Sequence, residues 1–163
     1  MATYSAKDIA FIFVQKGIDD SKPITQMKLQ KMIYFAHGWH LADNNGEPLV
    51  SEKFEAWKFG PVIPYLYDIF RVYGKFPIVD TFWLKITCGY EVPEKLDKNA
   101  NDTIDSTWNL LKDIDAIQLS NWTHRDDSPW HEAYHEHQRN SIIPNTSIQK
   151  YFTQFVSFDE ETE

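Results

Sequence analysis

The chain has 163 residues and a mass of 19.2 kDa, a size that fits one domain. Six Trp, eight Tyr and eleven Phe make up 15% of it, and this aromatic content in an ordinary globular composition excludes a disordered chain. The formal net charge of −8 argues against direct nucleic-acid binding, which needs clustered cations to contact phosphates.

The sequence carries signs of a reducing compartment. Cys88 is the single cysteine, so an internal disulfide is excluded and a cysteine metal site is not expected. The first residues do not combine a basic region with an apolar run, and the longest apolar run, Ile9–Val14, is far shorter than the ~20 residues that span a bilayer. We therefore expect a cytoplasmic protein without a membrane partner.

Two helices are predicted in the first part of the chain. Ser5 followed by Asp8 is typical of a capping box, and Gly17 is expected to end the first helix. Thr25 is expected to cap a second helix that ends near Asp43. One arc of this second helix carries Leu29, Met32, Ile33, Ala36, Trp39 and His40. Its less apolar side carries Lys28, Lys31 and Tyr34, and the two lysines are either solvated charges or partner-binding residues.

An extended insert follows, around residues 48–60. Alternation over Phe54–Phe59 predicts a short strand, and the dipeptide at 60–61 is expected to break it. Pro64 then begins a helix that ends at Gly74. The aromatic residues of this region, Trp57, Tyr65 and Tyr67, are either core packing or the anchor of a protein interface, where Trp and Tyr supply much of the binding energy.

The second half of the chain is more helical. The segment 82–86 fits a strand or a short helix, and residues 97–102 are expected to form a polar loop. Further helices are predicted from about Thr103, after Asp115 and after Ser128, and a last one from Asn145 or Thr146. The whole predicts a mainly α, compact single domain of about six helices over residues 1–156, with an acidic and frayed tail at 157–163.

The sharpest isolated motif is His131-Glu132-Ala133-Tyr134-His135, an H-E-x-x-H pattern. On one helix its two histidines would share a face and could hold Zn²⁺, with Glu132 as general base. The start at Ser128, however, puts His131 in the first helical turn, and His137 points to another face. We expect an amphipathic surface helix here and keep a small zinc-dependent hydrolase as an alternative.

Other chemistry has weaker support. His37, His40 and His124 could be imagined as a metal site, but His40 falls on the apolar arc and is expected to be a hydrogen-bonded core histidine. Glycine-rich phosphate loops and a G-x-S-x-G motif are absent from the sequence. We therefore expect a protein that is not an enzyme, with no catalytic residues, no metal and no cofactor.

Several blocks together resemble the Panacea antitoxin domain, the SocA-like family once described as phage-associated GepA-type proteins. The blocks are MKLQKMIYFAHGWHLA at 27–42, EAWKFGPVIPYLY at 55–67, LSNWTH at 119–124 with PW at 129–130, and IQKYF at 148–152. Their order and approximate spacing also agree, and the resemblance covers about residues 5–156. The resemblance implies framework roles for Leu29, Gln30, Tyr34, Trp39, Gly60, Pro61, His124 and Trp130.

The resemblance implies an antitoxin, often carried in a prophage, that neutralises a cognate protein toxin by direct contact. The toxin is expected to be encoded by the adjacent gene. A protease adaptor, which delivers its bound partner to a AAA+ protease, is the alternative implied by one branch of the family. Residues 76–163 carry a net charge of −9, which would suit a basic partner. The partner-binding residues that we predict are Trp57, Tyr65, Tyr67, Lys28 and Lys31.

Overall fold

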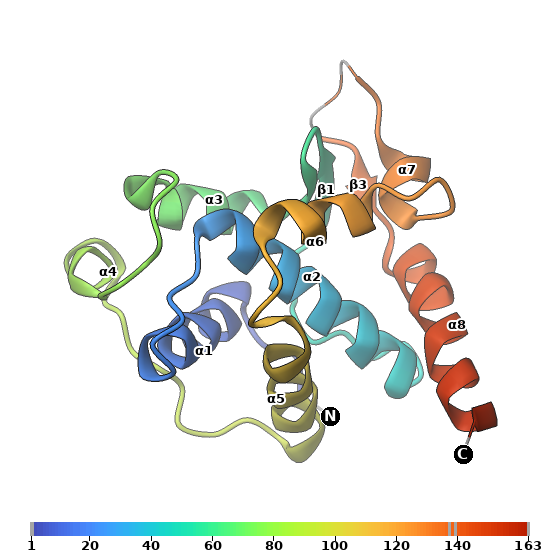
Figure 1. Ribbon diagram of the computed structural model, residues 1–163, viewed down its shortest axis with the longest axis horizontal. Coiled ribbons are helices and arrows are strands. Elements are labelled where there is room, and N and C mark those ends of the chain that lie inside the picture. Colours follow the sequence, from blue (N-terminus) through green and yellow to red (C-terminus); the bar gives the residue numbers. More distant parts are fainter. Residues whose placement is uncertain (1, 137, 139, 163) are drawn as a thin grey trace.

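Helix α2 (Gln26–Asp43) runs through the middle of the computed structural model, which describes residues 2–136, 138 and 140–162 and side chains as far as Phe155 (Figure 1). The helices packed against it are α1 (Ala6–Asp19), α3 (Pro64–Phe70), α5 (Lys98–Leu111), α6 (Ala116–Thr123) and α8 (Asn145–Thr162). Because neighbours surround it, 12 of its 18 residues are buried. The burial therefore extends beyond the apolar arc to a second face of α2.

Local capping explains where most helices begin. The side chains of Ser5, Thr25, Asp115 and Ser128 each accept a hydrogen bond from a backbone N–H of the first turn, as predicted. Helix α1 continues two residues past the predicted end at Gly17. The prediction of a polar loop at 97–102 is wrong, because Asp97 caps α5 by accepting from the Ala100 N–H.

The shorter elements complete the helical part. Helix α3 is followed by the single turn η1 (Arg71–Tyr73), and the chain leaves it at Gly74, as predicted. The ambiguous segment 82–86 belongs to a helix, α4 (Phe82–Cys88). Helix α7 (Pro129–Ala133) has only five residues. The described chain therefore holds eight α-helices, which confirms a mainly α fold with more and shorter helices than predicted.

A three-stranded antiparallel sheet forms the extended insert, in the order β2-β1-β3. Strand β1 (Phe54–Trp57) and strand β2 (Gly60–Val62) form a hairpin in which Trp57 pairs with Gly60. The prediction that residues 60–61 end the extended segment is wrong, since they open its second strand. Strand β3 (Ile142–Ile143) was not predicted.

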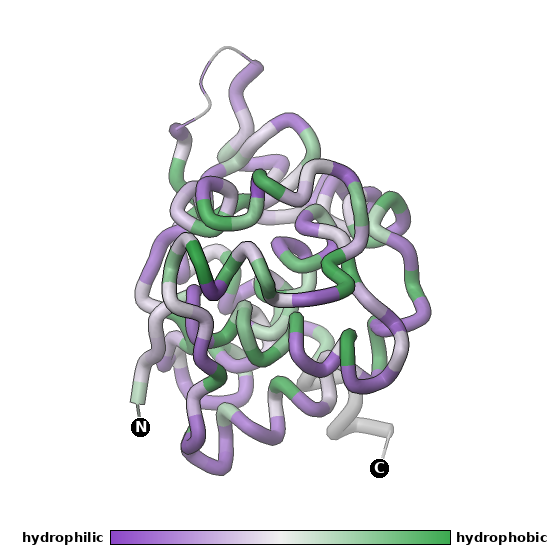
Figure 2. Tube along the Cα trace, turned by 90° about the vertical axis from the view of Figure 1, so that its left-hand side faces the viewer, coloured by the Kyte–Doolittle hydropathy of each residue, from purple (hydrophilic) through white to green (hydrophobic). Residues whose placement is uncertain are grey.

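The core is built around aromatic rings from α2, α8 and β1. Tyr34 packs edge-on against Phe54 and Phe152, with ring centroids 5.3 and 5.8 Å apart. Its assignment to the less apolar side of α2 is wrong, because the ring is 2% exposed. Figure 2 shows the hydrophobic stretches gathered in the middle of the trace and hydrophilic ones along its lower edge. Beside these rings Gly38 lets the ring of Phe152 lie directly on α2.

The predicted domain limit at 156 and the frayed tail stay predictions. Helix α8 has its last residue at Thr162, but side chains beyond Phe155 lie outside the described part.

Candidate functional site: a clamped turn beside an apolar pocket

Side chains from three helices hold the turn between β1 and β2 by its backbone carbonyls. Trp130 Nε1 donates to the Trp57 oxygen at 2.6 Å, and His124 Nε2 lies 2.9 Å from the Lys58 oxygen. Ser120 Oγ donates to the Phe59 oxygen at 2.7 Å. Lys31 Nζ, from α2, donates to the Pro61 oxygen at 3.4 Å. This set of contacts, which we call the turn clamp, fixes the backbone that carries Trp57, Lys58 and Phe59.

The turn clamp gives a physical reason for the LSNWTH and PW blocks. His124 Nδ1 lies 2.5 Å from the Ser120 oxygen and 3.2 Å from Thr123 Oγ1, so both ring nitrogens have hydrogen-bond partners. The same ring lies on Trp130 with centroids 3.8 Å apart, and Trp130 stacks on Tyr134 at 4.6 Å. Side chains of the blocks at 119–124 and 129–130 thus bind the backbone of the block at 55–67 by hydrogen bonds.

Replacing Trp130 with phenylalanine tests the turn clamp. The variant keeps a ring for the stack but removes the donor to the Trp57 carbonyl, so we expect the free energy of unfolding to fall by about 2 kcal/mol. Urea unfolding measures it. Trp83→Phe on α4 is the control, since that ring is 48% exposed and should change the stability by less than about 0.5 kcal/mol. Equal losses in both variants would contradict the role of the clamp.

The clamped turn forms one wall of a pocket of about 670 Å³. The half-buried Trp57 packs on Tyr67 with ring centroids 5.2 Å apart, and Phe59 is 63% exposed. The turn also contributes Lys58. The remaining lining residues come from α2, its N-cap, β2, the segment after η1 and the start of α6, and they are Thr25, Gln26, Met27, Gln30, Lys31, Val62, Gly74, Lys75 and Ala116. The volume falls within the range of ligand sites, which are concave and mostly apolar.

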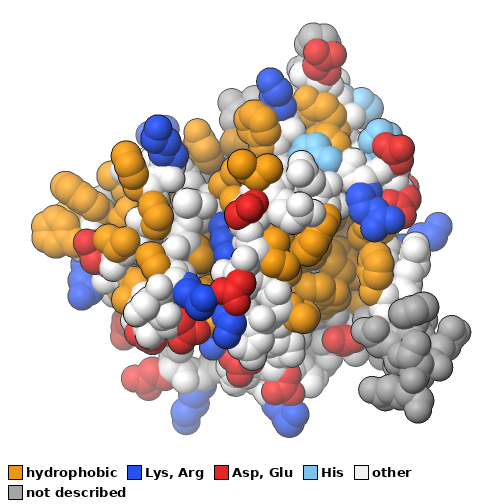
Figure 3. All heavy atoms as spheres, viewed as in Figure 1, with side chains coloured by type: hydrophobic (Ala, Val, Ile, Leu, Met, Phe, Trp, Pro, Cys, Tyr) orange, Lys and Arg blue, Asp and Glu red, His pale blue; other side chains and the backbone are white. Residues whose placement is uncertain are grey.

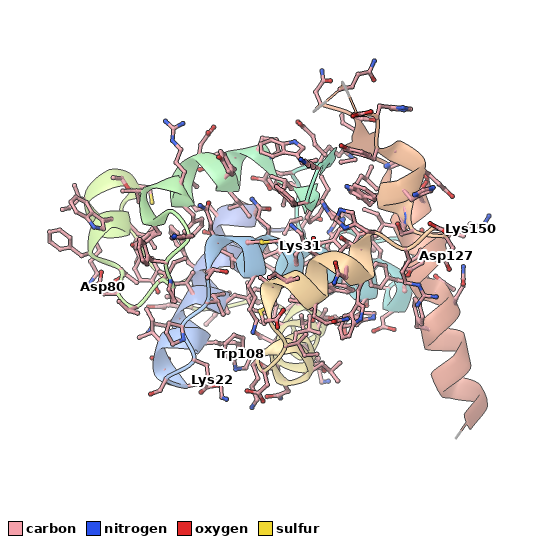
Figure 4. The ribbon with its side chains drawn as sticks, turned by 45° about the horizontal axis from the view of Figure 1, so that its top comes forward. Lys22, Lys31, Asp80, Trp108, Asp127 and Lys150 are labelled. Atoms are coloured by element: carbon pink, nitrogen blue, oxygen red, sulfur yellow. The ribbon has the colours of Figure 1, made fainter. Side chains whose placement is uncertain are left out.

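Lys31 is the unexpected residue of this pocket. We predicted it on the less apolar side of α2, yet it is 2% exposed. Burial lowers the pKa of its ammonium to about 8. Figure 4 shows it near the middle of the molecule, between α3 and α6. Gly60 has a φ of +121°, a conformation that favours glycine, and a Cβ there would lie 2.6 Å from Lys31 Cε and would displace the lysine side chain.

Gln30 fixes the other end of strand β2. Its amide donates to the Ile63 oxygen at 3.1 Å and accepts from the Ile63 N–H at 2.9 Å. Leu29, also expected to be framework, is buried, and Trp39 is half-buried against Phe152 at 5.9 Å. The two Gln30 hydrogen bonds hold the start of α3 against α2.

The structure brings Trp57, Tyr67 and Lys31 together and leaves the other two predicted partner-binding residues outside the pocket. Tyr65 is 46% exposed and lies with Tyr67 on a shallower hollow over α3. Lys28 Nζ donates to the Lys112 oxygen at 2.6 Å, where it meets the carboxyl-terminal end of α5. Sequence reasoning missed Phe59, Lys58 and Lys75 as pocket residues. For Phe59 and Lys58 the signal was the turn between β1 and β2, which the expected break at 60–61 concealed. Lys75 lies outside this turn, directly after Gly74.

The geometry that the alternative of a zinc site needs is not found at the H-E-x-x-H motif. Helix α7 ends at Ala133 and Tyr134 is extended, so His131 and His135 do not share a helical face. His37 is buried, lies 2.9 Å from Asn145 Oδ1 and has its pKa lowered to about 4 by burial. His40 is a core histidine whose Nδ1 lies 2.7 Å from the Glu47 oxygen, as predicted.

Metal-ligand clusters of three or more His, Cys, Asp or Glu are not found within residues 2–136, 138 and 140–162. His137, which follows the H-E-x-x-H motif by two residues, lies outside the described residues.

A second apolar surface lies over η1, α4 and the segment between them (Figure 3). Its side chains are each 48–67% exposed, and they are Val72, Phe76, Val79, Phe82, Trp83 and Ile86. We call it the α4 patch. In the part of the chain that the structure describes, helices long and apolar enough to cross a bilayer are not found.

Comparison with known proteins places the chain in a family. Residues 29–131 match the family described as antitoxin SocA-like, Panacea domain. Antitoxin SocA of Caulobacter vibrioides (strain NA1000 / CB15N) is 35% identical over 128 residues, which cover 77% of this chain and 68% of that relative. The chain belongs to the SocA-like Panacea domain family, as the resemblance implied. No solved structure matches it significantly.

Proposed function

We propose that this protein is an antitoxin that neutralises a protein toxin by binding it at the apolar pocket. The relative from Caulobacter vibrioides is named an antitoxin, and family membership supports a toxin partner here. The toxin is encoded by the adjacent gene, and both proteins act in the cytoplasm. The role is one of binding rather than catalysis, and no direct contact with nucleic acid or membrane is proposed.

We choose the pocket as the toxin-binding surface because an aromatic pair lies on its wall, where the turn clamp fixes the backbone. Trp57 and Tyr67 are in contact, only part-buried, and the backbone of Trp57 is fixed by Trp130. Rigid Trp and Tyr side chains beside a pocket are the usual centres of binding energy in protein interfaces. A fixed wall also limits the entropy that is lost on binding. Toxin activity is blocked when the bound antitoxin covers its active or target-binding surface.

Alanine at Tyr67 is the direct test. Because 40% of this ring is exposed, its removal should leave the fold intact and weaken toxin binding about 30-fold. The native two-gene segment is expressed, the tagged protein is captured, and the amount of the bound product of the adjacent gene is measured. Expressed alone, that product should arrest growth. The comparison variant is Trp83→Ala, an exposed aromatic of the α4 patch. Loss of toxin with Trp83→Ala and not with Tyr67→Ala would contradict the pocket as the binding surface.

A protease adaptor is the second candidate, and the α4 patch favours it. An adaptor holds its cargo and a AAA+ protease at once, so it needs two surfaces, and the patch lies outside the pocket. Toxin abundance in growing cells separates the two mechanisms. If the antitoxin only covers the toxin, the toxin level stays unchanged. If it delivers the toxin to the protease, the toxin level falls, and Trp83→Ala should restore that level while toxin binding persists.

A further inference from the structure

Lys31 is a buried cation without a carboxylate partner in the described part of the chain. Its Nζ makes one hydrogen bond there, to the Pro61 oxygen at the long distance of 3.4 Å, and it joins none of the ion pairs. An ammonium group has three N–H donors, and a buried charge normally has a close partner of opposite sign. Lys31 lines the pocket, so a bound partner can supply what the chain does not.

The charged residues that line the apolar pocket are all cationic, although the protein is acidic. Three of its lining residues are Lys31, Lys58 and Lys75, and none is Asp or Glu, although the chain has a net charge of −8. The other lining groups are largely aromatic and aliphatic. Positive charge concentrated beside low-dielectric walls attracts a carboxylate strongly, because the walls reduce screening.

The available hydrogen-bonding groups favour a side-chain carboxylate over a chain terminus. A terminus would carry its own peptide groups into the pocket, where they would need partners. Both halves of the Gln30 amide are already used by Ile63. An acidic side chain instead reaches inward while its backbone stays at the rim.

We propose that the pocket binds an acidic side chain of the partner, Asp or Glu, next to an apolar side chain. The carboxylate pairs with Lys31, and the apolar neighbour packs against Trp57 and Tyr67. The proposal rests on the proposed function only for the statement that the partner is the toxin. A partner that is basic overall, as the charge of residues 76–163 suggests, fits this binding mode when it presents one such acidic anchor.

Capped peptides test the binding mode without a toxin. The probes are Ac-Leu-Glu-Phe-NH₂, its Gln analogue, and Ac-Gln-Leu-Phe with a free carboxylate at its end. Binding is followed by NMR at the Trp57 indole, assigned with Trp57→Phe. We expect the Glu peptide to bind about tenfold more tightly than either other peptide, because a charge-assisted hydrogen bond forms only there. Equal binding of the Glu and Gln peptides, or tighter binding of the free terminus, overturns the proposal.

The variant Lys31→Met should lower the affinity for the Glu peptide to that of the Gln analogue. The exposed Lys85→Met on α4 is its control and should change nothing. The ¹³Cε resonance of Lys31 in the unmodified protein is an independent readout should the variant fold poorly. The Glu peptide must shift it, and the Gln peptide must not. An unshifted resonance refutes the proposal.

The two proposals fail separately. Selective Glu-peptide binding with no toxin captured contradicts only the antitoxin function. Toxin captured through Tyr67, with no preference for the Glu peptide, contradicts only the acidic anchor.

Discussion

Replacing Lys31 with methionine should stabilise the free protein at pH 7 by about 3 kcal/mol. Burial lowers the pKa of this ammonium to about 8, against about 10.4 in an unfolded chain, and each pKa unit corresponds to about 1.4 kcal/mol. Methionine has a similar length and carries no charge, so it removes the unfavourable burial. The measurement is urea unfolding of both proteins at pH 7.

The same argument fixes the pH dependence. Between about pH 8 and 10.4 the unfolded state binds more protons at Lys31 than the folded state, so unmodified protein gains stability as pH rises. The advantage of Lys31→Met should therefore shrink by pH 10. The control, Lys85→Met, should stay within about 0.5 kcal/mol of the unmodified protein at both pH values. A variant that is less stable at pH 7, or an advantage independent of pH, would refute this account.

Replacing Gly38 with alanine should destabilise the protein by about 3 kcal/mol. An added Cβ would lie 2.3 Å from two ring carbons of Phe152, so α8 must move away from α2 or the ring must leave its place. The effect opposes helix propensity, since alanine in mid-helix is favoured over glycine by about 1 kcal/mol. Thermal and urea unfolding measure the loss.

A double-mutant cycle identifies the cause. Phe152→Leu removes the ring that meets the new methyl group, so adding Gly38→Ala to it should have a much smaller effect than adding it to the unmodified protein. Equal effects in the two backgrounds would show that the contact with Phe152 is not responsible.

Helix starts could be predicted from the sequence because capping is local. Thr25 and Ser128 accept hydrogen bonds from N–H groups three residues away, so the determining groups lie within one short window. The strand at 54–57 was visible for a similar reason, from alternation. Strand β3 could not be predicted, because its two residues pair with β1 across about half of the chain length, and two residues show no periodicity of their own.

The candidate site could be predicted only in part. Trp57 and Tyr67 stand out by residue type. Lys31 looks solvated on a helical projection, and only the packing of β2 on α2 buries it. Lys28, with the same expectation, contacts the end of α5 instead. Residue type and helical phase define a face, whereas burial depends on what the rest of the chain places over that face.

The turn clamp also sets when the binding wall can form during synthesis. Trp57 and its partner Trp130 are 73 residues apart. At about 5–20 residues per second, about 4 to 15 s pass before the ribosome supplies the second residue. Until then a nascent chain carries the hairpin without its support. Under the proposed function, toxin binding at this wall therefore requires chains that have been synthesised past Trp130, and a chain stalled before that residue does not neutralise the toxin.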